Sequence, residues 1–206
     1  MTLVGVSKTV GADRLAAAAT AGITILGENR VQEAGLKAPL LPGVTWHLIG
    51  PLQSNKARRA VEIFDVIQSV DSVELAHRLD RLCGEVDRPE RLGVYLQVNI
   101  DRDASKAGFL PQDLEAGLGE IAALSSLRIL GLMTVGNLVG SAGEARPTFA
   151  RLRELSGLLR SRFELLGPGL SMGMSGDYEV AVEEGATVVR VGRALFGDRR
   201  GPVAGA

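Results

Sequence analysis

This sequence of 206 residues lacks several features that mark common functional classes. Its single cysteine cannot form an internal disulfide, so nothing indicates an oxidising compartment. The formal net charge is -1, whereas a general nucleic-acid-binding protein normally carries a basic excess. No apolar run approaches the roughly 20 residues that a membrane-spanning helix needs. We therefore expect a cytoplasmic globular protein that binds neither nucleic acid nor membranes.

Motifs of several enzyme classes are also absent. No cluster of His, Cys and Asp residues has the spacing of metal ligands, and no GxSxG pattern is present. The first apolar segment continues into SKTVGAD rather than GxGxxG, which argues against a Rossmann-type dinucleotide site. Aromatic residues make up only 4% of the chain, so the core must be mainly aliphatic.

Glycine is abundant, and short apolar runs alternate with segments of helical spacing. The 26 glycines exceed the roughly 14 that average usage would give. The predicted strands are residues 3–8, 23–27, 45–50, 65–70, 92–100, 127–133, 169–174 and 187–192. Helical spacing is clearest over residues 12–21, 73–83, 114–124 and 149–166. Eight strand–helix units without an internal linker predict an α/β protein with a single (β/α)8 TIM barrel spanning residues 1–206.

One lysine stands where the first predicted strand ends. In a TIM barrel the carboxyl ends of the strands meet at the face that carries the chemistry. Lys8 follows the apolar run 3–6, and a partly desolvated amine at that place is a nucleophile toward carbonyl groups. A surface lysine that lies along the strand end is an equally weighted alternative.

Two glycine-rich loops follow the seventh and eighth predicted strands, at residues 171–176 and 191–197. Glycine lets the backbone come close to an anion, and backbone N–H groups, serine and arginine can bind it. The loops after these two strands commonly hold a phosphate group in TIM barrels. Together the loops predict a ligand that carries a phosphate.

Arg190 interrupts the apolar run 188–191, and a buried charge is costly without a partner. It either pairs with an acidic residue of a neighbouring strand or presents a fixed cation to a ligand. A nucleophilic Lys8, a phosphate cradle and Arg190 match the aldehyde, phosphate and ring nitrogen of pyridoxal 5′-phosphate. A Schiff-base aldolase that acts on a sugar phosphate without a cofactor is a weaker alternative.

The remaining candidates favour structural roles. Cys83 lies on the apolar stripe of a predicted helix and is expected in the core. His77 neighbours Arg78 on the same helix and is expected in solvent. His47 lies in the middle of a predicted strand, where it is either a hydrogen-bonded core residue or part of a ligand site inside the barrel.

Longer motifs, which run in order over nearly the whole chain, resemble those of the pyridoxal phosphate homeostasis proteins, the YggS/PROSC group of alanine-racemase N-terminal-domain-like proteins. The most specific are HxIGxLQxNK and SMGMSxD. The matching segments are VSKT at 6–9, GENRVQEA at 27–34, WHLIGPLQSNKAR at 46–58, SVD at 69–71, QVNI at 97–100, SKAGF at 105–109, GLMT at 131–134, the segment 170–192 and ALFG at 194–197.

This resemblance implies a fold-type III barrel with pyridoxal 5′-phosphate joined to Lys8 as a Schiff base. It further implies that Ser171 and Gly192 hold the phosphate and that Arg190 faces the pyridine nitrogen, which makes the cofactor a poorer electron sink. The other implied pocket residues are Asn29, His47, Met133, Met174 and Ser175. Arg193 replaces a threonine that is frequent in the family, and we expect it to strengthen anion binding.

The function expected from these observations is to bind, buffer or deliver pyridoxal phosphate to apo-enzymes, without robust catalysis. Related racemases use a tyrosine of a second domain as an opposing acid or base. Here the chain ends soon after the eighth predicted strand, and neither Tyr95 nor Tyr178 obviously faces Lys8. A racemase-like enzyme of low activity is the alternative. Because the barrel needs no partner to close, we expect a monomer.

Overall fold

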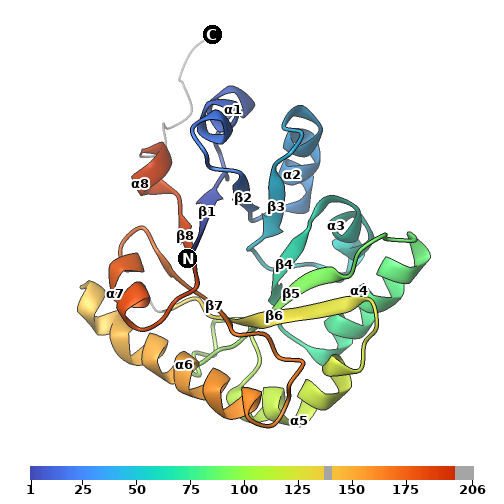
Figure 1. Cartoon of the computed structure of the whole chain (residues 1–206), viewed down its shortest axis with the longest axis vertical. Coiled ribbons are helices and arrows are strands. Elements are labelled where there is room, and N and C mark those ends of the chain that lie inside the picture. The colour runs from blue at the N-terminus through green and yellow to red at the C-terminus, as the bar shows by residue number, and fades with distance from the viewer. Residues whose placement is uncertain (137–140, 198–206) are drawn as a thin grey trace.

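The computed structural model describes residues 1–136 and 141–197. In this part of the chain, parallel strands close into a barrel in the order β1 to β8, and β8 pairs with β1 (Figure 1). The strands are β1 Thr2–Val6, β2 Ile25–Glu28, β3 Thr45–Leu48, β4 Val66–Val70, β5 Leu92–Gln97, β6 Leu127–Met133, β7 Gly169–Met174 and β8 Val188–Val191. The predicted TIM barrel is confirmed. Of the predicted domain, residues 137–140 and 198–206 lie outside the described residues.

Helices surround the ring of strands (Figure 1). The α-helices are α1 Ala12–Thr20, α2 Val31–Lys37, α3 Ala57–Ile63, α4 Val73–Glu85, α5 Pro111–Ala122, α6 Arg146–Arg160, α7 Tyr178–Glu183 and α8 Arg193–Phe196. Short 3₁₀ turns are η1 Ala38–Leu40, η2 Ser54–Lys56 and η3 Ala142–Ala145. The helix predicted over residues 149–166 was misplaced, because Pro147 in the first turn starts α6 earlier and the chain leaves the helix at Ser161.

The barrel has two apolar regions because strand side chains alternate between its two faces. The larger region lies between the strands and the helices and includes Trp46 and Leu48 of β3. A smaller cluster of buried residues contains Val4, Val66, Tyr95, Met133 and Val188. Its strand members share the barrel-lining face, so the interior is packed at this level.

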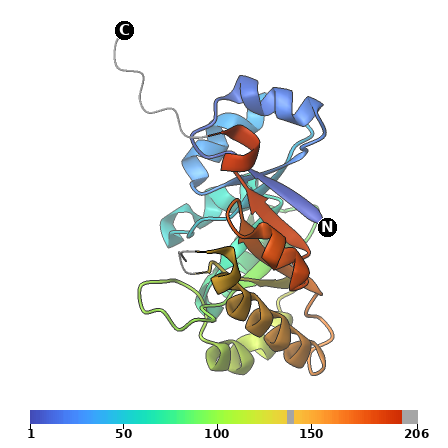
Figure 2. The ribbon, with the colours of Figure 1, turned by 90° about the vertical axis from the view of Figure 1, so that its left-hand side faces the viewer.

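Polar side chains follow on the same face, nearer the carboxyl ends of the strands. In β8, Arg190 comes two residues after Val188 and therefore lies one layer closer to that end. In the side view of Figure 2, the N-terminus lies at the right, and the loop between β5 and α5 protrudes at the left, where the strands end. The helices in the described ranges all fall short of the length and apolar character that a membrane span needs.

Candidate functional site

Lys8 lies in a tight turn just beyond β1, at the carboxyl end of the barrel. It is half-buried, and the next residue, Thr9, adopts a left-handed backbone with φ 64°. The carbonyl of the preceding Ser7 accepts hydrogen bonds from the Val10 N–H at 3.0 Å and from Lys37 Nζ at 2.8 Å. These two bonds to one carbonyl fix the peptide that carries Lys8.

A buried ion pair stands behind this turn. Lys37 Nζ of α2 lies 2.5 Å from Glu28 Oε1 at the end of β2, and the Ser7 hydroxyl donates to the same oxygen at 2.8 Å. The Asn29 N–H donates to Glu28 Oε2 at 3.2 Å. The fully buried Glu28 carboxylate thus has a cation and two further donors, as a buried charge requires. We refer to Ser7, Glu28 and Lys37 as the Lys8 clamp.

A second polar group crosses the barrel interior. Arg190 Nη1 of β8 donates to Ser171 Oγ of β7 at 2.6 Å, and the Ser171 hydroxyl lies 2.6 Å from Gln68 Oε1 of β4. Gln68 Nε2 lies 2.7 Å from His47 Nδ1 of β3. The second guanidinium nitrogen, Nη2, donates to the Thr134 carbonyl at 2.8 Å. We call His47, Gln68, Ser171 and Arg190 the interior chain.

The interior chain carries one buried positive charge without a paired anion. No carboxylate among the described residues forms an ion pair with Arg190, so the predicted alternative of an acidic partner is wrong for this part of the chain. Burial lowers the pKa of Arg190 to about 10, and the charge of Asp177 opposes that shift, so the guanidinium stays charged at neutral pH. Burial also lowers the pKa of His47 to about 4, so this imidazole is neutral. The barrel interior is therefore cationic at this layer.

The two glycine-rich loops lie against each other, as expected from their positions. The Gly192 N–H donates to Ser175 Oγ at 3.2 Å, which links the loop after β8 to the loop after β7. The Asp177 carboxylate accepts from the Met174 N–H at 2.6 Å and so closes the β7 loop. A Cβ added at Gly192 would lie 3.2 Å from Val6 Cβ, which shows how closely the β8 loop approaches β1.

The two serines of the β7 segment have different surroundings. Ser171 is fully buried, and its hydroxyl is engaged by Gln68 and Arg190. Ser175 is half-buried and lies at the junction of the two loops. The Ser171 hydroxyl is thus bonded within the barrel interior, whereas the Ser175 hydroxyl faces the loop after β8. Arg193, the residue after Gly192, is exposed.

Other predicted residues are distributed around the same end of the barrel. Asn29 follows β2 and is half-buried, whereas Met133 ends β6 and is fully buried. Tyr95 lies in the apolar interior cluster, where burial raises its pKa. Tyr178 begins α7, and its hydroxyl lies 3.3 Å from Glu179. As expected, Cys83 is buried and His77 is exposed.

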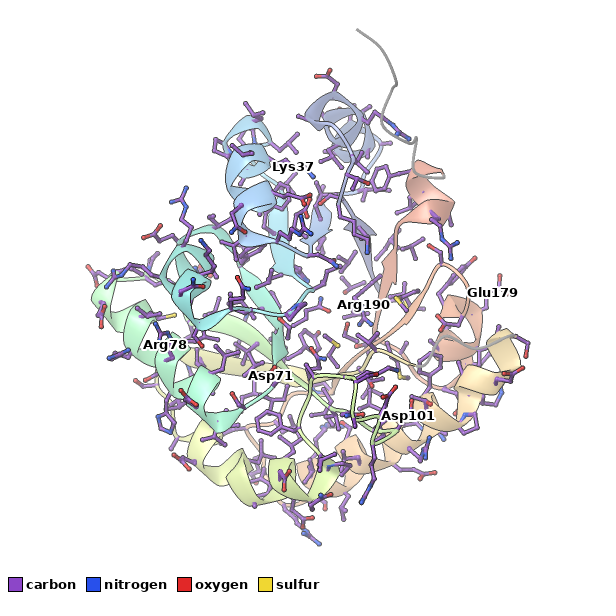
Figure 3. The ribbon with its side chains drawn as sticks, turned by 180° about the vertical axis from the view of Figure 1, so that it is seen from behind. Lys37, Asp71, Arg78, Asp101, Glu179 and Arg190 are labelled. Atoms are coloured by element: carbon purple, nitrogen blue, oxygen red, sulfur yellow. The ribbon has the colours of Figure 1, made fainter. Side chains whose placement is uncertain are left out.

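Sequence reasoning missed four polar residues at or near the site: Glu28, Lys37, Gln68 and Asp71. Figure 3 looks onto the carboxyl end of the barrel, with Arg190 and Asp71 near the middle of the molecule and Lys37 beside β2. Asp71 directly follows β4, and partial burial raises the pKa of its carboxyl. A polar residue within an apolar strand was the available signal for Gln68, and Glu28 directly follows the predicted strand 23–27, at the end of the barrel where polar residues gather. In the described residues, no group of His, Cys, Asp and Glu could hold a metal ion.

The chain is similar to curated proteins over almost its whole length. It is 42% identical to the pyridoxal phosphate homeostasis protein of Synechocystis sp., with 96% of this chain and 91% of that protein covered. It is 45% identical to the protein of the same name from Pseudomonas aeruginosa, with 96% and 84% covered.

Solved structures give the same result. The structure of PipY from Synechococcus elongatus with PLP bound has a TM-score of 0.90 and 46% identity, and the match covers 96% of this chain and 92% of that chain. Alanine racemase of Clostridium difficile, at 15% identity and a TM-score of 0.79, shares only the fold over 53% of its length. The family model "Alanine racemase, N-terminal domain" matches residues 1–200. The chain therefore belongs to the alanine racemase N-terminal domain family, within its group of pyridoxal phosphate homeostasis proteins.

Proposed function

We propose that this protein binds pyridoxal 5′-phosphate covalently through Lys8 and serves to hold, buffer or deliver the cofactor inside the cell. The observation that carries the proposal is the close likeness, at 46% identity, to a PipY structure with PLP bound. Residues 1–206 would form a single cofactor-binding domain in the cytoplasm. Because β1 and β8 of one chain close the barrel, we propose a monomer.

The residues present fit this cofactor. Lys8 is half-buried at the carboxyl end of β1, and the joined loops at Ser175 and Gly192 offer a hydroxyl beside closely packed backbone. Arg190 adds a buried cation without an anionic partner among the described residues. A cationic interior favours a ligand that carries a phosphate, because the ligand supplies the missing negative charge.

Each group would have a separate task when the cofactor is bound. Pyridoxal 5′-phosphate supplies an aldehyde that reacts with amines. The Lys8 clamp holds the backbone beside the reacting amine, and Ser175, Gly192 and Arg193 would bind the phosphate. Arg190 would face the ring nitrogen, and Asn29, His47, Met133 and Met174 would surround the ring. An arginine at that nitrogen does not favour a protonated ring, which weakens carbanion chemistry and suits a carrier.

Visible absorbance of the purified full-length chain tests the cofactor. We expect the wild type, mixed with pyridoxal 5′-phosphate and desalted, to retain a visible band. Sodium borohydride should abolish this band by reducing the linkage and should leave the cofactor permanently attached to Lys8. Lys8→Ala should lose the band. The control is Lys106, which lies on the loop after β5 and whose Nζ donates to the Val135 carbonyl; Lys106→Ala should keep the band. A wild type that retains no cofactor would overturn the proposal.

Two further measurements test the carrier role. Cofactor released from the wild type should activate an apo-enzyme that needs pyridoxal phosphate, and the cofactor-free Lys8→Ala protein should not activate it. Interconversion of D- and L-amino acids should stay far below ordinary enzyme rates. Racemisation at such rates, lost in Lys8→Ala, would instead favour the racemase-like alternative.

A further inference from the structure

The interior chain has a direction, because its members differ in what they can donate. A guanidinium only donates, so Ser171 Oγ accepts from Arg190 Nη1 at 2.6 Å. The Ser171 hydroxyl can then donate its one proton to Gln68 Oε1 at 2.6 Å. With its oxygen engaged there, Gln68 turns Nε2 toward His47 Nδ1, 2.7 Å away, and donates to it. Every donor–acceptor step therefore runs from Arg190 toward His47.

The opposite orientation of the Gln68 amide would break this order. Its nitrogen would face Ser171, and its oxygen would require a proton on His47 Nδ1. The Ser171 hydroxyl would then receive two donors and find no acceptor among the described residues. Ser171 is fully buried, and a buried hydroxyl without an acceptor is destabilising. The direction from Arg190 to His47 leaves no such unpaired group.

We propose that Gln68 is a positioning residue that holds His47 as the neutral tautomer protonated on Nε2 and, through Ser171, fixes the position of Arg190. No described residue hydrogen-bonds His47 Nε2, so its N–H remains available to a ligand. At the other end, Arg190 is fixed by Ser171 and by the Thr134 carbonyl. One amide thus sets both a neutral donor and a cation for the same bound molecule.

The consequence for pyridoxal phosphate rests on the proposed function, but the tautomer does not. A cofactor that meets a fixed N–H donor and a fixed cation loses less freedom on binding than one that must order them. Removing Gln68 should therefore weaken binding of pyridoxal 5′-phosphate without removing any group that contacts it.

Nitrogen NMR of the cofactor-free full-length protein tests the direction of the chain. The protein has two histidines, so the variant His77→Gln leaves a single imidazole spectrum and assigns His47. Long-range ¹H–¹⁵N correlations at pH 7 should show His47 with protonated Nε2 and unprotonated Nδ1. A His47 that is protonated on Nδ1, or that exchanges between both tautomers, would overturn the proposal.

The isosteric variant Gln68→Glu should reverse the tautomer of His47. A carboxylate offers two acceptors and no donor, so one oxygen still accepts from Ser171 while the other faces His47. The His47 proton should then move to Nδ1, or both nitrogens should become protonated. If Gln68→Glu leaves the wild-type tautomer unchanged while the protein stays folded by circular dichroism, Gln68 does not set the tautomer.

The cofactor readout uses Gln68→Leu beside Gln32→Leu, an exposed glutamine of α2. We expect Gln68→Leu to weaken pyridoxal 5′-phosphate binding by about tenfold, the net worth of one to two hydrogen bonds, and to shift the visible band. Gln32→Leu should change neither. Equal affinity in both variants would refute the link to the cofactor. If the wild type itself binds no cofactor, the proposed function fails, while the NMR result on the unloaded protein still decides the role of Gln68.

Discussion

The Lys8 clamp and the interior chain solve the burial of charge in opposite ways. In the clamp, the Glu28 carboxylate and the Lys37 ammonium are 2.5 Å apart and neutralise each other. In the interior chain, Arg190 is surrounded by neutral acceptors, and the chain ends on a neutral imidazole. The clamp is thus complete in itself, which suits a structural support. The interior chain keeps a positive charge that forms no ion pair among the described residues, which suits a place where a ligand supplies the anion.

The largest difference should appear when one charge of the clamp is removed. Glu28→Gln leaves the largely buried Lys37 beside an amide, with only the Glu33 carboxylate 3.9 Å away. Breaking such a pair should cost about 3 kcal/mol of the free energy of unfolding. The double variant Glu28→Leu with Lys37→Met removes both charges and should recover most of that loss. Urea denaturation followed by circular dichroism measures both. A double variant as unstable as Glu28→Gln would show that the pair itself, rather than its unpaired remnant, stabilises the fold.

The pH dependence of stability should come from the interior chain through His47. Burial lowers the pKa of His47 in the folded protein to about 4, against an ordinary 6.5 in the unfolded chain. Between these values unfolding takes up a proton, so the contribution is complete above pH 6.5 and falls as the pH drops toward 4. The loss over this window is about 3 kcal/mol.

The measurement is urea denaturation of the wild type and His47→Asn at pH 7, 6, 5 and 4. Because carboxylates also titrate below pH 5, only the difference in unfolding free energy between the wild type and His47→Asn reports on His47. An exposed residue that does not titrate provides the control, and Gln32→Leu should follow the wild type. If the wild type and His47→Asn lose stability in parallel, the imidazole is not held neutral by burial.

The sequence was informative where a local pattern decides the structure. Apolar runs separated by helical spacing located all eight strands, and a charge within the run 188–191 identified Arg190. Gln68 interrupts β4 in the same way, but it is uncharged and therefore gave a weaker signal. The helices α2 and α3 escaped notice because seven residues are too few to show a helical period.

Contacts between elements could not be read in this way. Lys37 reaches Glu28 and Ser7 only because α2 packs back beside the ends of β1 and β2. The different surroundings of Ser171 and Ser175, four residues apart in one glycine-rich segment, depend on where β7 ends and its loop begins. The spacing of residues along the chain predicts neither the Lys37 contacts nor the surroundings of the two serines, since both arise from closure of the barrel.

The smallest expected loss of stability comes from removing either of two serine hydroxyls of equal burial. Ser7 and Ser171 are both fully buried, and replacement by alanine removes the same single oxygen from each. Ser171→Ala leaves both Gln68 Oε1 and Arg190 Nη1 without a partner among the described residues, which should cost about 2 kcal/mol of unfolding free energy. Ser7→Ala leaves Glu28 Oε1 bound to Lys37, so about 1 kcal/mol is expected.

Pyridoxal 5′-phosphate should widen the difference between these two variants. Ligand binding stabilises the folded state by an amount that grows with the logarithm of affinity. Ser171→Ala removes one of the two hydrogen bonds that hold Arg190, the cation that would face the cofactor, whereas Ser7→Ala leaves both in place. Thermal denaturation with and without the cofactor should therefore show a smaller stabilisation for Ser171→Ala than for Ser7→Ala. An equal stabilisation would mean that the ligand itself orders Arg190, so that the interior chain supports the barrel rather than its site.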